Sequence, residues 1–297
     1  MGFLSPGDLS DPLFQNLTLN YRLPRLILAM LLGMSLSASG FVLQMIFQNP
    51  LVEPGFLGVS QGAAFGAALA IIFFGSSLIV AEVAASLFSL LGLFLSVFLA
   101  RKLRYGGWVL RLILAGIAIS AFFSAGVGVL KYLADPLKQL PEITFWLLGG
   151  LWGSSWSQVI FIFSPVLLCL AVLFSFRWRI NLLTLEESTA FSLGVRVSRE
   201  RILVLLLAVI PVAAMVSISG IVSWIGLIIP HIARRISGAN AQFALPSSLL
   251  LGGAFGLICD TVARTALAGE IPLGILTSLL GAVLFLIFLS LPQRRTG

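Results

Sequence analysis

One short stretch of the chain has the residue types and spacing of an activated nucleophile. Ser60 lies in GVSQG at 58–62, which fits the G-x-S-x-G pattern that places a serine on a sharp turn between a strand and a helix. Such a serine needs a histidine base, and the only histidine is His231, next to Pro230 near the end of an apolar run. We expect His231 and Pro230 to serve packing and a helix break. Because GVSQG opens another apolar run, a serine hydrolase is kept only as an alternative.

Groups that bind metals or form disulfides are few. Cys169 and Cys259 both lie deep in apolar runs, and a single histidine completes no set of ligands at the usual spacing of a zinc site. We therefore expect no disulfide framework, no metal site and no cofactor bound by this chain.

Carboxylates inside apolar helices could couple transport to an ion gradient. The candidates Glu82 and Asp260 fall toward the ends of such runs, and Asp260 has Arg264 at i, i+4. A gradient-driven secondary transporter stays a second alternative, since serines and backbone carbonyls in a membrane also bind sodium. None of the three lysines belongs to a G-K-[ST] phosphate loop, so we expect the chain to hydrolyse no ATP by a site of its own.

Composition determines the elements that must carry these residues. The 297 residues are 59% hydrophobic and 10% charged, whereas about a quarter of the residues of a soluble domain are charged. Uncharged runs such as 26–52, 54–81 and 271–293 exceed the ~20 helical residues that cross a hydrocarbon layer about 30 Å thick. The sequence predicts an all-α, polytopic transmembrane protein, with residues 1–297 in a single transmembrane domain.

Two uncharged runs are too long for one crossing. Residues 202–233 would form a helix of about 48 Å, so we expect a break at Ser219-Gly220. The second run covers 143–176, and its first part, 143–155, contains Trp146 and Trp152 and is followed by Trp156. We expect 143–155 to be an interfacial element at the depth of the lipid headgroups. The predicted spans, about nine, are 24–47, 59–76, 80–100, 109–130, 156–176, 200–218, 221–237, 247–267 and 272–291.

The net charge of +7 comes from small basic clusters between the apolar runs, which is how orientation signals are distributed. With the C-terminus inside, thirteen of the eighteen Lys and Arg residues face the cytoplasm. Arg22, Arg25, Lys131, Lys138 and Arg264 then lie outside, as does the N-terminus. Small residues at four-residue spacing, such as Gly252 and Gly256, favour close helix packing.

The stretch TLEESTAFSLGVRVSRER at 184–201 is unusually polar for this chain. Thr184 and Glu187 have the spacing of a capping box, and Gly194 suits the left-handed residue that ends a helix. The pattern predicts a short helix over 185–193, with Ser198 capping the next span. On the cytoplasmic side such a helix is either a dock for a soluble partner or a solvated connector.

Several stretches together resemble one family. EESTAFSLG at 186–194 resembles the coupling-helix loop of FecCD-type, BtuC-like permeases, which belong to ATP-binding-cassette (ABC) importers of iron-siderophore, haem and cobalamin in bacterial inner membranes. YRLPRLILAM at the start of 21–67, GIVSWIGLIIPHIARRISG at 220–238 and DTVARTALAGEIP at the start of 260–289 are similar to the same family, in the family's order. The likeness runs from about residue 5 to the C-terminus.

The resemblance implies roles for three groups of residues. Residues 184–195 would be the cytoplasmic coupling-helix loop, and its contacts with an ATPase subunit would be Glu186, Glu187, Ala190 and Gly194. The arginines that pair with glutamates of a binding protein would be Arg22, Arg25 and Arg264. A cytoplasmic gate between two permease copies would include Val109 and Leu110. The arginines also have a purely structural interpretation, as snorkelling anchors and as a partner of Asp260.

The resemblance further implies the assembly. It predicts a homodimer with the path on its two-fold axis, two cytoplasmic ATPase subunits that bind ATP and Mg²⁺, one extracytoplasmic binding protein, and no nucleic acid. The cargo stays open among siderophore, haem, cobalamin and oxyanion. Family members usually have ten spans, whereas SPGD at 5–8 stands near the end of their first span, so the start is truncated or lacks that helix. No signal peptide is expected.

Overall fold

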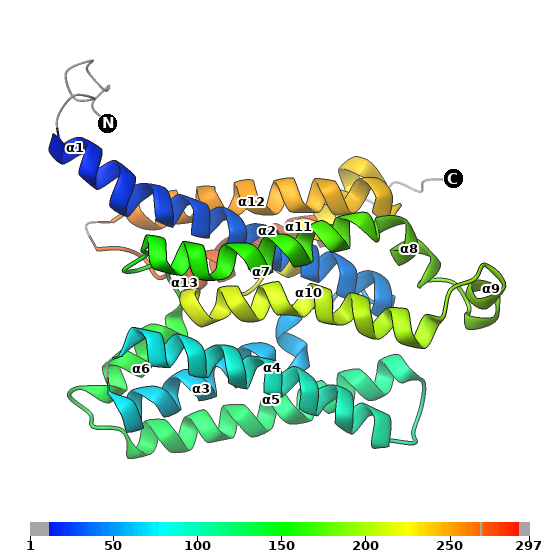
Figure 1. Ribbon diagram of the computed structural model, residues 1–297, viewed down its shortest axis with the longest axis horizontal. Helices are drawn as coiled ribbons and strands as arrows, with labels where there is room; N and C mark the ends of the chain where they lie inside the picture. Colours follow the sequence, from blue (N-terminus) through cyan, green and yellow to red (C-terminus); the bar gives the residue numbers. More distant parts are fainter. Residues whose placement is uncertain (1–11, 76, 268, 291–297) are drawn as a thin grey trace.

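The computed structural model describes residues 12–75, 77–267 and 269–290, and consists of helices joined by short segments (Figure 1). The opening SPGD and the basic pair Arg294-Arg295 lie outside these residues. The elements are α1 Pro12–Leu17, the π-helical turn η2 Thr18–Arg22, α2 Leu23–Phe47, the 3-10 turn η3 Pro54–Leu57, α3 Val59–Phe74, α4 Leu78–Lys102, α5 Trp108–Leu133, α6 Gln139–Leu148, α7 Trp156–Ser175, α8 Arg177–Leu182, α9 Glu187–Ser192, α10 Val197–Ser219, α11 Ile225–Ser237, α12 Ala241–Thr265 and α13 Leu273–Ser290.

Each of the nine predicted spans overlaps one of these helices, and the predicted ends at residues 76 and 291 lie outside the described residues. Among the described residues, six helices are long and apolar enough to cross a membrane, and α3 and α13 are shorter apolar helices. The first of the six runs without interruption from Leu13 to Phe47, so it begins before the predicted start at residue 24. α11 has 13 residues, about 20 Å, and is too short to cross alone. The all-α polytopic fold predicted from composition is confirmed.

α2 is the central helix of the larger group of helices and packs on α10, α11 and α12. Leu28, Leu32 and Phe41 on it are fully buried. At the crossing with α12, a Cβ added to Gly33 would lie 1.9 Å from the carbonyl oxygen of Gly252, so only glycine lets the backbones meet. The close packing predicted for the small residues of α12 is therefore present.

Gly220 reverses the chain between α10 and α11, as predicted. It has a φ of +65°, and a Cβ there would lie 2.2 Å from the carbonyl oxygen of Trp146. The break expected at Pro230 is wrong, because α11 continues through it to Ser237. A proline leaves the carbonyl four residues earlier unpaired, here that of Gly226, and Gln44 Nε2 on α2 donates to it at 3.3 Å. A neighbouring helix thus replaces the missing bond.

The interfacial element predicted for 143–155 is only partly a helix. α6 begins earlier, at Gln139, and ends at Leu148, after which the backbone N–H of Gly150 donates to the carbonyl of Ser219 at 2.7 Å. Gly149, which has a φ of +69°, follows the last residue of α6 and ends the helix. Trp152 and Trp156 are partly exposed, while Trp146 packs against the core.

The polar segment differs from its prediction at both helix starts. The capping box is wrong, because the Thr184 hydroxyl donates to the carbonyl of Asn181 at the end of α8, and α9 begins only at Glu187. Ser198 does not cap the next span, since α10 already begins at Val197. Gly194 does end α9, with a φ of +81° and the paired backbone bonds of a Schellman motif.

Candidate functional site

Two of the three predicted docking arginines meet on one carboxylate. Arg25, in the first turn of α2, places Nε 2.9 Å from Asp260 Oδ1, and Arg264 on α12 places Nε 3.1 Å from Asp260 Oδ2. Arg25 Nη1 also lies 2.9 Å from Glu270 Oε1. Asp260 is fully buried, whereas the side chains of Arg25 and Arg264 are 13% and 25% exposed. The i, i+4 pair anticipated for Arg264 is confirmed; the bonds to Arg25 join residues too far apart in sequence to predict.

Arg22 completes what we call the arginine cluster, defined as Arg22, Arg25 and Arg264. It is exposed, stands one turn before Arg25, and has no ion pair or hydrogen bond within the part of the chain that the structure describes. The cluster therefore presents one guanidinium ready for an outside carboxylate and two that are already held by carboxylates of this chain.

α9 projects from the other end of the molecule, at the right of Figure 1. The predicted coupling residues Glu186, Glu187 and Gly194 are exposed on it. Ala190 is fully buried, so it lets α9 lie close to the chain beneath and is not itself on the surface.

Exposed apolar side chains on this segment were not singled out from the sequence. Phe191 and Leu193 are 71% and 55% exposed, and Leu185 just before α9 is 38% exposed. Large apolar residues within a short polar helix were the available signal, since exposed apolar patches mark interaction surfaces. Phe191 and Glu187 also line a surface cavity of about 230 Å³ between α9 and the start of α10.

The turn before α9 is tied to two long helices. Gln48, which ends α2 in a left-handed conformation, donates from Nε2 to the carbonyl of Thr184 at 2.7 Å. Asn181 on α8 accepts from the backbone N–H of Ala241 at 2.9 Å and donates to the side chain of Asn240 at 2.8 Å. These bonds connect the turn before α9 to the end of α2 and connect α8, which precedes that turn, to the start of α12.

The arginine cluster and α9 lie at opposite ends of α2. Arg25 stands in its first turn and Gln48 follows its last residue. The helix has 25 residues and is about 38 Å long, more than the thickness of a hydrocarbon layer. One rigid, buried helix thus separates the two surfaces by the width of a membrane.

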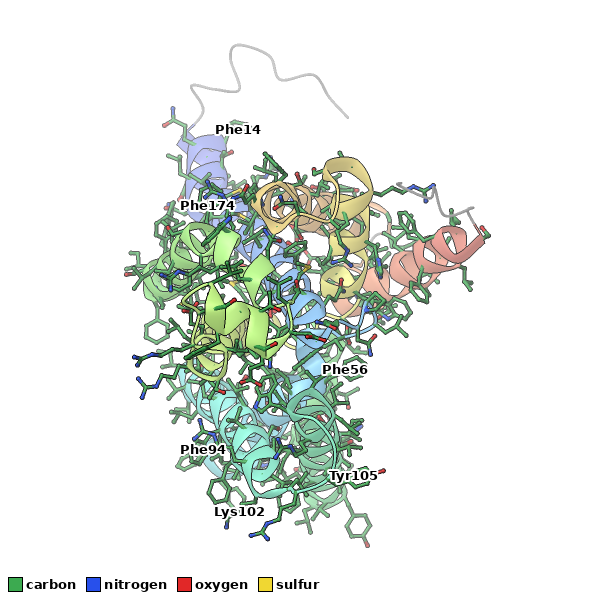
Figure 2. The ribbon with its side chains drawn as sticks, turned by 90° about the vertical axis from the view of Figure 1, so that its right-hand side faces the viewer. Phe14, Phe56, Phe94, Lys102, Tyr105 and Phe174 are labelled. Atoms are coloured by element: carbon green, nitrogen blue, oxygen red, sulfur yellow. The ribbon has the colours of Figure 1, made fainter. Side chains whose placement is uncertain are left out.

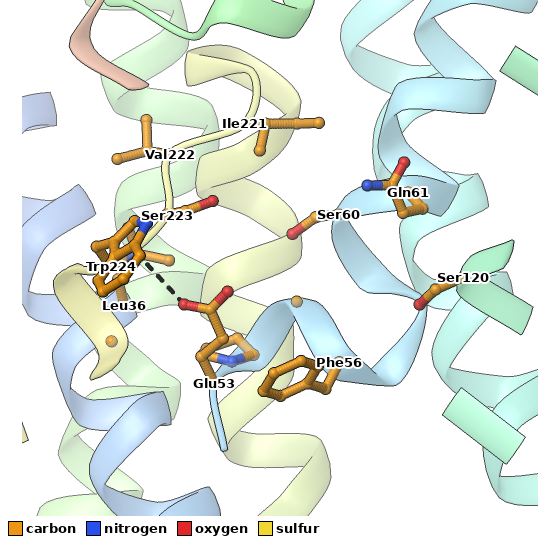
Figure 3. A pocket seen from close by; sticks show the side chains of 13 residues that line it. Leu36, Glu53, Phe56, Ser60, Gln61, Ser120, Ile221, Val222, Ser223 and Trp224 are labelled. Atoms are coloured by element: carbon orange, nitrogen blue, oxygen red, sulfur yellow. Dashed lines mark hydrogen bonds between the residues drawn. The ribbon is translucent and has the colours of Figure 1, made fainter. Parts of the chain in front are cut away.

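A cavity of about 240 Å³ lies between these ends, where α3 and α11 begin (Figure 3). We call it the polar cavity because polar side chains point into it from three segments. Glu53, just before η3, points into it together with Ser60 at the start of α3 and Ser120 on α5. Ser120 Oγ is buried and has no hydrogen-bond partner among the described residues. Two helix N-termini and a carboxylate meeting inside an apolar bundle are typical of a solute path.

Trp224 forms one wall of this cavity in an unusual backbone conformation. Its φ is +74°, a region that costs a non-glycine residue about 1–3 kcal/mol. Its backbone N–H donates to Glu53 Oε2 at 3.3 Å, and its ring lies 6.1 Å from that of Phe285 on α13. These contacts join residues far apart in the chain, so no local pattern in the sequence predicts the arrangement.

The predicted gate residues lie between the cavity and the α9 end. Val109 and Leu110 occupy the first turn of α5; Val109 packs against the core and Leu110 is 42% exposed. Their neighbour Trp108 lies with its ring 6.2 Å from that of Phe47, at the end of α2. Ser120 on the same helix lines the cavity about 15 Å further along.

The alternative chemistries are not favoured by this arrangement. No histidine lines the cavity of Ser60, and His231 Nε2 lies 3.1 Å from the carbonyl of Pro50 instead. Glu82 accepts a hydrogen bond from Gln158, and Asp260 is held by arginines. Neither the serine nor these carboxylates has the surroundings that catalysis or ion coupling needs.

The fold and the site together define a polytopic membrane permease. The model of the FecCD transport family matches residues 3–291. Among similar proteins is the molybdate import system permease protein MolB of Haemophilus influenzae, 45% identical over 93% of this chain and 81% of the relative. The hemin transport system permease protein HmuU of Yersinia pestis is 40% identical over 94% of this chain and 85% of the relative. A solved structure, an inward-facing conformation of a metal-chelate type ABC transporter, is 44% identical over 94% of this chain and 89% of that chain, with a TM-score of 0.89.

The chain therefore belongs to the FecCD transport family. It is a permease subunit of an ABC importer, a transport component without an ATPase site of its own, and it works with ATPase and substrate-binding partners.

Proposed function

We propose that the chain forms a homodimer that imports a metal chelate across the inner membrane, with two ATPase subunits at the α9 end and one binding protein at the arginine cluster. The hemin permease and the metal-chelate type structure support this cargo class. Molybdate is the second candidate cargo, because a molybdate permease is 45% identical to this chain.

The observation that carries the proposal is the placement of two docking surfaces at opposite ends of α2. Basic residues gather at the α9 end, where Arg101 and Lys102 end α4 and Arg234 on α11 donates to Gln44 near the end of α2. By the positive-inside rule this end, and with it the end of α13, faces the cytoplasm. The arginine cluster then faces outward, toward a binding protein.

The same contacts supply a coupling route. ATP and Mg²⁺ bind the ATPase subunits and not this chain, and closure of those subunits moves α9 through Glu186, Glu187 and Phe191. Gln48 is bonded to the turn before α9, so the displacement reaches the segment 48–58. Glu53 in this segment accepts a hydrogen bond from Trp224 and so connects it to the start of α11. The polar cavity then opens alternately to the outside and to the cytoplasm, and the gate at Val109 and Leu110 controls the cytoplasmic opening.

A pair of single substitutions tests the two docking surfaces independently. The transporter is reconstituted in proteoliposomes with its ATPase and its binding protein. Arg22→Glu is expected to weaken binding-protein docking about tenfold and to leave the ATPase bound. Phe191→Asp is expected to release the ATPase and to leave docking unchanged. Arg22 is chosen because it is exposed and its reversal leaves the Asp260 pairs intact. Unchanged docking of Arg22→Glu would remove this role of the cluster.

The cargo is tested by uptake into the same vesicles. Radiolabelled iron-siderophore, haem and molybdate are supplied outside the vesicles together with the binding protein. ATP is enclosed inside the vesicles, where it reaches ATPase subunits bound at the α9 end. Uptake of a chelate supports the first candidate, whereas uptake of molybdate alone supports the second.

A further inference from the structure

A second cavity, of about 430 Å³, lies as a groove between α4 and α10. Leu93 and Leu205 form its floor, at 2% and 0% exposure, and Phe94, Phe98 and Leu206 rise beside them, at 62%, 46% and 40% exposure. Figure 2 places Phe94 on one flank of the molecule and Phe56, beside the polar cavity, on the other. The groove therefore belongs to neither the solute path nor the docking surfaces.

The groove has the length of one lipid leaflet. Its α4 residues recur at three- and four-residue spacing from Leu90 to Arg101, which makes one stripe along the helix. Eleven residues of helix rise about 17 Å, roughly half of the ~30 Å hydrocarbon layer. A groove of this length, parallel to helices that cross the membrane, matches an acyl chain in the leaflet where α4 ends.

Positive charge stands at one end of the groove only. Nine of its ten lining residues are apolar, and the tenth is Arg101 in the last turn of α4. Arg101 is exposed and has no ion pair or hydrogen bond in the part of the chain that the structure describes. Lys102 Nζ lies 4.6 Å from the ring centroid of Phe98, which stacks at 6.1 Å on Phe94, so a second cation sits at the same end.

We propose that this groove binds one anionic phospholipid, with an acyl chain between α4 and α10 and the phosphate at Arg101. A peptide is a poor occupant, because nothing in the groove except Arg101 would satisfy its backbone. A helix from a second copy is also a poor occupant, because at about 10 Å wide it would rest on the rims of the groove and not reach the floor. An anionic headgroup, in contrast, gains from each basic residue at the membrane surface.

The test is a lipid titration of the delipidated transporter in detergent, followed by native mass spectrometry. Dioleoylphosphatidylglycerol is expected to bind about fivefold more tightly than dioleoylphosphatidylcholine. Arg101→Gln is expected to remove most of this preference, because only Lys102 then remains at this end, and to leave phosphatidylcholine binding unchanged. Arg104→Gln, which removes a charge three residues away outside the groove, is the matched control and should keep the preference.

A second variant separates the groove from its charge. Val97→Phe narrows the groove and is expected to lower the retention of both lipids, with an unchanged melting temperature as the check on folding. Equal binding of the two lipids by the unmodified transporter would overturn the proposal. So would an equal loss of preference in Arg104→Gln, which would indicate diffuse surface charge, or displacement of the lipid by free glycerol phosphate, which would indicate a phosphate pocket.

Discussion

Asp260 is the residue on which the packing of the outer end depends. It is fully buried at the end of α12, and it pairs with Arg25 from α2 and Arg264 from its own helix. A buried carboxylate is tolerated only when it is paired, and removal of one partner leaves the other charges uncompensated. Two arginines of the cluster that we propose for binding-protein docking therefore also link α2 to α12.

We expect Asp260→Asn to lower the free energy of unfolding by about 3 kcal/mol, because Arg25 and Arg264 lose a buried partner. Glu270→Gln should change it by less than about 1 kcal/mol, since Glu270 is 35% exposed and its ion pair is solvated. Thermal unfolding of both variants in the same detergent measures the difference. Equal melting temperatures would contradict the role of Asp260 as a link between α2 and α12.

Gly220 and Gly153 form a second comparison of single residues. Both have a left-handed backbone, with φ of +65° and +70°, but a Cβ at Gly153 would meet nothing within 4 Å. Gly153→Ala should cost about 1 kcal/mol from the backbone alone. Gly220→Ala adds the contact with the Trp146 carbonyl and should cost about 3 kcal/mol or more. Melting temperatures and the yield of folded protein measure the difference between the two variants. A similar loss of stability in both would mean that the backbone shifts enough to remove the contact with the Trp146 carbonyl.

At the scale of elements, residues 48–58 connect the two halves of the mechanism. Their first residue, Gln48, binds the turn before α9, and Glu53 within them binds the start of α11. Residues 48–58 also join α2 to α3 across the middle of the bundle (Figure 1). In the proposed mechanism this segment carries the motion of α9 to the polar cavity, because it has one hydrogen bond at each site.

We expect Gln48→Ala to lower the amount of cargo moved per ATP hydrolysed about threefold, because in the proposed mechanism the bond to the Thr184 carbonyl transmits the motion of α9. ATPase binding should be unchanged. Gln139→Ala is the control: Gln139 also donates to a backbone carbonyl, that of Ile72, but on α6 at the far end of the bundle. The ratio of uptake to hydrolysis in proteoliposomes measures the effect, and an equal loss in both variants would assign it to general loosening.

The elements were predictable where local chemistry determines them. Runs of apolar residues bounded by charges predicted the helices, and Gly220 and Gly194 predicted two chain reversals, because glycine adopts a positive φ with little strain. The capping box failed because the Thr184 hydroxyl had a competing acceptor, the Asn181 carbonyl, which no short pattern reveals.

The candidate sites were predictable only in part for the same reason. The resemblance indicated the arginines and the loop at 184–195, but the bond between Arg25 and Asp260 joins residues 235 apart, and that between Trp224 and Glu53 joins residues 171 apart. Such pairs are set by how α2, α11 and α12 pack. These pairs cannot be predicted from a single sequence, because it does not show how the helices pack.

At the scale of the whole molecule, the polar cavity indicates which face the two copies of the proposed homodimer share. Ser120 on α5 lines the cavity, and Trp224 packs beside it on Phe285 of α13. In Figure 2 the red end of the chain, which is α13, and Tyr105 before α5 lie on the same side as Phe56. A path on a two-fold axis needs this side turned inward, so α5 of one copy should face α13 of the other.

We therefore expect Ile117→Cys combined with Leu279→Cys to form a disulfide between two copies on oxidation. Both side chains are exposed, at 52% and 64%, on the helices that flank the cavity. The native Cys169 and Cys259 are buried, so they should not compete. Non-reducing electrophoresis of oxidised membranes measures the dimer, and each single variant should stay largely monomeric. The control combines Leu90→Cys with Phe94→Cys on the opposite flank, because a surface that faces lipid should give no specific dimer. A dimer from the control pair alone would contradict the prediction, since it would place the shared face on the α4 side of the molecule.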